Sequence, residues 1–283
     1  MTAFPLFIVG SPRSGTSILV RALQGGGYYG YSEGNFLSIL RAIGRAVDLH
    51  FETYGATNPR LLTAHLDKEA LKTALYRVVT DAVAAQHVGK VWLDKTGNPE
   101  MIEAIPFLRG IWPEARFIFA KRRAIENITS RVKKFPSRTF RYHCADWARN
   151  MAAWRRLMAF VPDLPAIEVD QRDIGERPAE TAARIASFLG MSAEAQAKMA
   201  AIFGSEVPEQ TEPGSARRML SLAGTGWTEQ QQRVFHRNCD EQMRAFGYSE
   251  DETYRDGVTA VDAPQPAMAA ISLASAWQHR VRD

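Results

Sequence analysis

The segment from Gly10 to Ser17, GSPRSGTS, has the residue types of an anion-binding loop. It follows the apolar, β-rich run from Leu6 to Val9, and its glycines favour a tight turn before a helix that we expect to begin at Thr16. The first backbone N–H groups of a helix have no intrahelical partner, and they carry the positive end of the helix dipole. A strand, a tight loop and a helix N-terminus therefore predict a site for a phosphate or sulfate group.

The loop nearly matches the pattern G-x-x-x-x-G-K-[ST] of nucleoside triphosphate sites, with one informative departure. Thr16 stands where that pattern has its lysine, and the cation lies inside the loop, at Arg13. A kinase or nucleoside triphosphatase with an altered loop is therefore one hypothesis. A binding protein on the same fold, without catalysis, is another.

A second strand, basic turn and helix follows later in the chain. Arg116 to Ala120 reads as a strand that leads to Arg122, and Ala124 to Lys134 reads as a helix with Ser130 about two turns along it. A guanidinium group grips phosphate with two hydrogen bonds and a permanent charge, and a serine hydroxyl can add a third bond. Arg122 and Ser130 are therefore a candidate second anion site.

Composition sets broad limits on the class of protein. The 283 residues are 46% hydrophobic and 23% charged, which is ordinary for a soluble globular protein. A net charge of +4 suits an anionic ligand but is too small to indicate nucleic-acid binding. We find no secretory signal and no apolar run of transmembrane length, so we expect a cytoplasmic protein. Cys144 and Cys239 lack metal-ligand spacing and are expected to be free thiols.

The order of elements predicts an α/β protein. At least four strands alternate with helices, which favours a three-layer α/β/α arrangement with a central parallel sheet. Tyr28 to Gly34 is expected to be irregular, and Pro99 to Arg109 to be one helix. We predict one domain over residues 1–255, followed by a linker and a C-terminal helix within 256–283. The apolar stripe at Trp147, Met151 and Trp154 is expected in the core.

The hexapeptide from Pro12 to Ser17 resembles the P-[KR]-S-G-T-[ST] loop of sulfotransferases that use 3′-phosphoadenosine 5′-phosphosulfate (PAPS). Arg122 and Ser130 have the spacing with which that family binds the 3′-phosphate. Asp94-Lys95-Thr96 resembles its [ED]-K-[ST]-P segment, although Gly97 replaces the proline. Two further stretches are similar to family segments, namely Glu168 to Gly190 and Gly224 to Trp227. The resemblance covers most of residues 5–248.

The resemblance implies a P-loop NTPase-like sulfotransferase fold and PAPS as co-substrate, without a metal. Arg13, with the loop residues Ser14, Gly15, Thr16 and Ser17, would hold the 5′-phosphosulfate. Arg122 and Ser130 would hold the 3′-phosphate. The remaining residues of the predicted cofactor-binding set are Arg217, Arg218 and Trp227.

The resemblance also implies catalytic roles. Lys95 would lie near the transferring sulfuryl group, together with Arg13. Glu33 would be the general base, because its string Ser-Glu-Gly-Asn-Phe-Leu resembles the G-E-P-x-F-[FL] segment that carries this glutamate in the family. The acceptor would be a hydroxyl of a carbohydrate, a lipid-linked molecule or a small natural product, and a homodimer is possible. We expect structural roles for the helical histidines His50, His65, His143 and His236.

Overall fold

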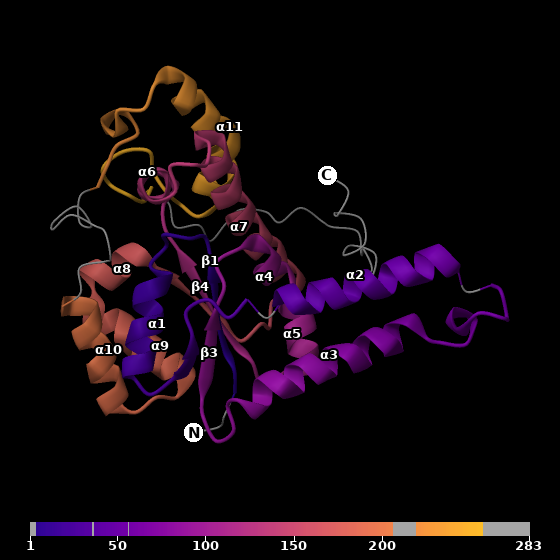
Figure 1. Ribbon diagram of the computed structural model, residues 1–283. Coiled ribbons are helices and arrows are strands. Elements are labelled where there is room, and N and C mark those ends of the chain that lie inside the picture. The colour runs from indigo at the N-terminus through magenta and orange to yellow at the C-terminus, as the bar shows by residue number, and fades with distance from the viewer. Residues whose placement is uncertain (1–3, 36, 56, 206–218, 257–283) are drawn as a thin grey trace.

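A single parallel sheet of five strands forms the centre of the molecule (Figure 1). The computed structural model describes residues 4–35, 37–55, 57–205 and 219–256. The strand order is β2-β3-β1-β4-β5, so consecutive parallel strands are joined through helices, as the alternating pattern predicts. The strands are β1 (Leu6–Gly10), β2 (Tyr29–Tyr31), β3 (Trp92–Lys95), β4 (Arg116–Lys121) and β5 (Ala166–Asp170).

Two hydrophobic cores, one on each face of the sheet, confirm the three-layer α/β/α prediction. Side chains of β1 alternate between them, because Leu6 and Ile8 join one core while Phe7 and Val9 join the other. The first core packs under α1 (Thr16–Gly25), α8 (Gln171–Glu176), α9 (Pro178–Leu189) and α10 (Ala193–Ser205). The second packs under α4 (Pro99–Glu103), α5 (Ile105–Ile111), α6 (Ala124–Lys134), α7 (Phe140–Phe160) and α11 (Glu229–Ala245).

The helices α2 (Leu37–Tyr54) and α3 (Lys68–Ala85) run side by side away from the sheet (Figure 1). We refer to residues 37–85 as the helical arm. Asp67 caps α3 by accepting a hydrogen bond from the Ala70 N–H, as its position in the sequence predicts. Asp48 of α2 pairs with the ammonium groups of α3, Lys72 at 2.6 Å and Lys68 at 3.0 Å. The arm also exposes seven large apolar side chains: Ile39, Leu49, Tyr54, Leu62, Leu66, Leu75 and Val78.

Three local predictions need correction. The segment expected to be irregular contains β2, an edge strand whose Tyr31 pairs with Asp94 of β3. Its two tyrosines are exposed and Gly30 lies between them, so the segment lacks the alternation of buried apolar and exposed polar residues that indicates a strand. The single helix expected over Pro99 to Arg109 is two helices that meet at Ala104, because Pro106 cannot donate the next helical hydrogen bond. The run from Lys90 to Leu93 predicts a short strand, and the observed strand β3 extends two residues further, to Lys95.

Other predictions about the core are confirmed. Trp147, Met151 and Trp154 are buried, and Cys144 and Cys239 are free, buried thiols on facing helices α7 and α11. Burial raises the pKa of the Cys239 thiol. Among the described residues, no helix combines the length and the apolar character needed to cross a bilayer. The predicted C-terminal helix lies outside the described residues, as do Arg217 and Arg218.

Candidate active site at the carboxyl edge of the sheet

The phosphate loop, residues 10–15, leaves the carboxyl end of β1 at the centre of the sheet. Gly10 has φ +134°, and a Cβ atom there would lie 2.1 Å from the Ala120 carbonyl oxygen, so only glycine fits against β4. Arg13 has a left-handed φ of 70°. Gly15, at the N-cap of α1, supplies no side-chain cap. The first N–H groups of α1 are therefore available to an anion.

Buried polar side chains of α6 and α7 support the phosphate loop on the side that faces the protein interior. The Asn127 amide donates to the Pro12 carbonyl oxygen at 2.9 Å and to Ser14 Oγ at 3.0 Å. Arg131 donates to Ser11 Oγ at 2.8 Å and pairs with Asp146 Oδ2 at 2.7 Å. This support was not predicted from the sequence. Asn127 and Arg131 lie one turn apart on α6, a spacing that could have indicated a shared polar face.

The two predicted anion-binding clusters meet in the structure. Arg13 Nε donates to Ser130 Oγ at 2.9 Å, and Arg122 Nη1 donates to the Arg13 carbonyl oxygen at 3.2 Å. Burial lowers the pKa of Arg122, and the charge of Arg13 lowers it further. Arg122 Nε is buried and has no hydrogen-bond partner in the described part of the chain. Two arginines joined through the Arg13 backbone, one of them with an unused donor, fit a ligand that carries phosphate or sulfate groups.

The neighbouring Arg123 has a different, structural role. It is fully buried and forms an ion pair with Glu126 through Nε, at 2.9 Å, and through Nη2. Its guanidinium group also donates to the carbonyl oxygens of Leu220, Ser249 and Asp251. Arg123 therefore ties the segments before and after α11 to the start of α6.

Glu33 and Lys95 form an ion pair at the same edge of the sheet. Lys95 is the last residue of β3 and pairs with Ile8 of β1, so it lies next to the phosphate loop. Its Nζ donates to Glu33 Oε1. The Lys95 side chain is 8% exposed and that of Glu33 is 62% exposed, so the carboxylate faces solvent while the ammonium group lies beneath it. An exposed carboxylate beside a buried cation can accept a proton from a bound hydroxyl group.

The other predicted site residues are placed differently. Trp227 packs edge-to-face on Phe140, with ring centroids 4.9 Å apart, and also contacts Phe235. These contacts belong to the core under α7 and α11, and a role of Trp227 in cofactor binding stays a prediction. His50 and His65 lie on the helical arm, and His143 is buried beside Arg131.

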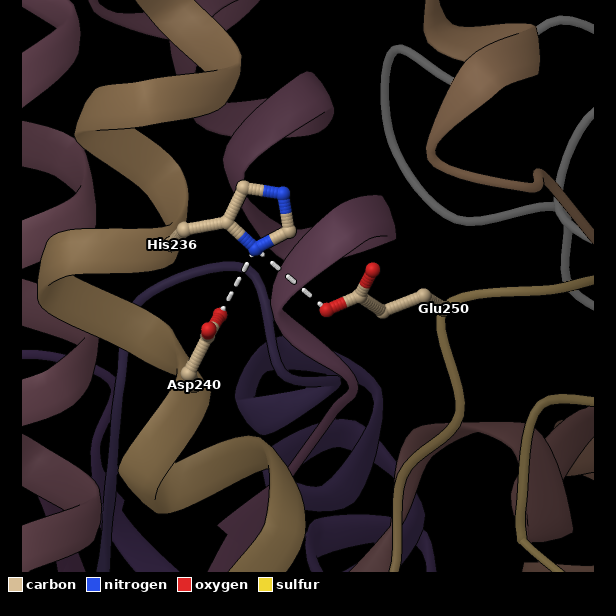
Figure 2. A group of neighbouring side chains, drawn as sticks. All are labelled: His236, Asp240 and Glu250. Carbon is tan, nitrogen blue, oxygen red and sulfur yellow. Dashed lines mark hydrogen bonds and ion pairs between the residues drawn. The ribbon is translucent and has the colours of Figure 1, made fainter.

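His236, Asp240 and Glu250 are the three neighbouring side chains, within the described ranges, that have the chemistry of metal ligands (Figure 2). The His236 Nδ1 atom lies 3.0 Å from Asp240 Oδ1 and 3.4 Å from Glu250 Oε1. They belong to α11 and to the segment that follows it, not to the phosphate loop. The three side chains are well explained as a polar contact that links α11 to residue 250.

Comparison with known proteins decides the family. The chain matches the family model described as "Sulfotransferase family" over residues 5–195, which is more than half of its length. The chain belongs to the sulfotransferase family. The matched range contains the phosphate loop, Glu33, Lys95, Arg122 and Ser130 of this sulfotransferase. A search of curated proteins gave no match.

Three solved structures are similar to this chain to different degrees. The sulfotransferase STF9 from Mycobacterium avium is 15% identical, with a TM-score of 0.51 over 85% of this chain and 77% of that one. Mouse sulfotransferase SULT7A1 complexed with PAP is 15% identical, with a TM-score of 0.48 over 85% of each chain. The sulfotransferase domain of the Synechococcus PCC 7002 olefin synthase is 22% identical, with a TM-score of 0.46 over 69% of this chain and 76% of that one. The likeness to STF9 confirms the predicted sulfotransferase fold.

Proposed function

We propose that this protein transfers the sulfuryl group of PAPS to an acceptor hydroxyl group on a carbohydrate, a lipid-linked molecule or a small natural product. The observation that carries the proposal is the joined cationic site made by Arg13, Arg122 and Ser130 at the N-terminus of α1. PAPS carries anionic groups at both its 5′ and 3′ positions, so it needs more than one cationic group. Membership of the sulfotransferase family supports the same donor.

The residues have distinct roles in the proposed reaction. The N–H groups of α1 and the Arg13 guanidinium bind the 5′-phosphate and take up the charge that grows there as the sulfur–oxygen bond breaks. Lys95 Nζ leaves Glu33 and binds the oxygens of the sulfuryl group. Glu33 then accepts the acceptor's proton while the acceptor oxygen bonds to sulfur, and 3′-phosphoadenosine 5′-phosphate departs.

A magnesium-dependent kinase or triphosphatase is the weaker proposal. Asp94 is an acidic residue near the end of β3 that could serve a magnesium ion, and it is 1% exposed. Burial raises the pKa of Asp94 to about 6, and so deep a carboxyl group offers little room to the water ligands that magnesium usually keeps. Magnesium-dependent ATP turnover by the purified protein would favour this alternative.

Calorimetric titration with 3′-phosphoadenosine 5′-phosphate tests the proposed donor. We expect Arg13→Ala to weaken binding about 10- to 100-fold, because a charge-assisted contact contributes about 1.5–3 kcal/mol. Arg149→Ala is the matched control, since Arg149 is 60% exposed and pairs with Glu100 on the surface. The proposal fails if the wild-type protein does not bind the nucleotide at high micromolar concentration, or if Arg13→Ala binds it as tightly as the control.

A further inference from the structure

Asp94, the residue before Lys95 in β3, is a buried carboxyl group that the proposed reaction does not use. It is 1% exposed. Thr96 Oγ1 donates to its Oδ2 atom at 3.0 Å, while the buried Oδ1 atom faces the Gly34 backbone without a well-formed hydrogen bond among the residues described. A buried carboxylate with incompletely satisfied hydrogen bonds costs free energy, so its retention calls for a physical reason.

The Oδ1 atom of Asp94 faces the turn that carries Glu33. A Cβ atom built on Gly34 would lie 1.8 Å from Asp94 Oδ1, so the backbone of Gly34 rests directly on this carboxyl group. The next strand residue, Lys95, binds the Glu33 side chain. Two consecutive residues of β3 therefore contact two consecutive residues of one turn.

Keeping a carboxyl group at this position lowers stability at neutral pH. Burial raises the pKa of Asp94 from its ordinary 3.8 to about 6, and the Glu33 charge adds to the rise, while Thr96, the Gly34 backbone and Lys95 oppose it. The folded chain therefore binds this proton more tightly than the unfolded chain. The resulting stability is complete below about pH 4 and is lost as the pH rises through 6. An unfavourable charge next to reacting groups is typical of residues kept for function.

We propose that Asp94 is a positioning residue that acts through Glu33. Its carboxylate holds the Glu33–Gly34 turn against the end of β3, so that Glu33 stays beside Lys95 and faces the acceptor hydroxyl group. This role rests on the proposed sulfuryl transfer. Within the described part of the chain, Glu33 and Lys95 are the charged groups that act on the Asp94 carboxyl group, and Tyr31 of β2 is its titratable neighbour in the sheet register.

Asp94→Asn tests the proposal because it keeps the shape of the side chain and removes the charge. We expect kcat at pH 7.5 to fall about tenfold or more through misplacement of Glu33, with nucleotide binding within twofold of wild type. The thermal midpoint should rise by about 2–5 °C at pH 7.5 and stay unchanged at pH 4. A residue needed only for folding would lose stability and activity together. Asp163→Asn, at a side chain that is 79% exposed, is the control and should change neither.

Two further measurements separate this proposal from the proposed function. The amide of Gly34 should exchange hydrogen faster in Asp94→Asn at pH 7.5, whereas amides of α1 should not, and this readout needs no turnover. In the wild type, kcat should fall below pH 6, and this fall should be absent in the variant. Unchanged exchange at Gly34 together with unchanged kcat would overturn the role of Asp94. A wild type that transfers no sulfuryl group would overturn the proposed function, and the exchange result would still decide whether Asp94 holds the turn.

Discussion

The two sides of the carboxyl edge differ in how firmly their side chains are held. On the β1–β4 side, Asn127, Arg131 and Arg123 are buried and hydrogen-bonded, and they fix the phosphate loop and the start of α6. On the β2–β3 side, Glu33 faces solvent and leads into the exposed helical arm. Charges that are already in place can bind an anionic donor that is the same in every reaction, without rearrangement. An open surface can vary in its residues to suit different acceptors. The proposed donor site is thus preformed, and the proposed acceptor side is open.

The largest effect on stability is expected on the β1–β4 side, where the adjacent residues Arg122 and Arg123 have different roles. Arg123→Ala should lower the free energy of unfolding by about 3–5 kcal/mol, because Glu126 would remain buried without its partner. Arg122→Ala, the matched control, should cost less than about 1 kcal/mol of stability and instead weaken nucleotide binding. Denaturant unfolding and calorimetry measure both. Equal losses of stability in the two variants would contradict the distinction.

The second prediction concerns kcat and the exposed carboxylate of Glu33 on the β2–β3 side. Glu33→Gln should lower kcat about 10²- to 10³-fold by removing the proton acceptor, while nucleotide affinity stays within twofold. Glu33→Asp, which keeps the carboxylate on a shorter side chain, should recover part of the rate. Retention of most of the wild-type rate by Glu33→Gln would show that another group accepts the proton.

The smallest effect is expected at the exposed face of the helical arm. Leu49→Ser and Val78→Ser replace side chains that are 60% and 67% exposed, so each should change the free energy of unfolding by no more than about 0.5 kcal/mol. Leu40→Ala is the contrasting variant on the buried face of α2, where Leu40 is 2% exposed, and should cost about 2–5 kcal/mol. A large loss of stability in the serine variants would mean that the exposed face is covered in solution.

Much of the fold can be predicted from local patterns. The bounds of α6 agree with the predicted range from Ala124 to Lys134. The sequence also predicts a helix from Pro178 to Leu189, which α9 matches, because Pro178 and Gly190 are local boundary signals. Edge strand β2 could not be predicted, because three residues with exposed tyrosines become a strand only by pairing with β3. The break at Ala104 was missed because the apolar pattern continues through it.

The candidate site likewise has features that local sequence predicts and features that only the tertiary structure shows. The sequence by itself determined the glycine loop and the helix start, which are local features, and it predicted Arg13, Glu33, Lys95, Arg122 and Ser130 as site residues. It could not predict the structural role of Arg123, because burial of this guanidinium depends on segments near residues 220 and 250 that only folding brings together. Only the tertiary structure joined Arg13 to Ser130 and placed the Asp94 carboxyl group beneath Gly34, because these contacts join residues far apart in the chain.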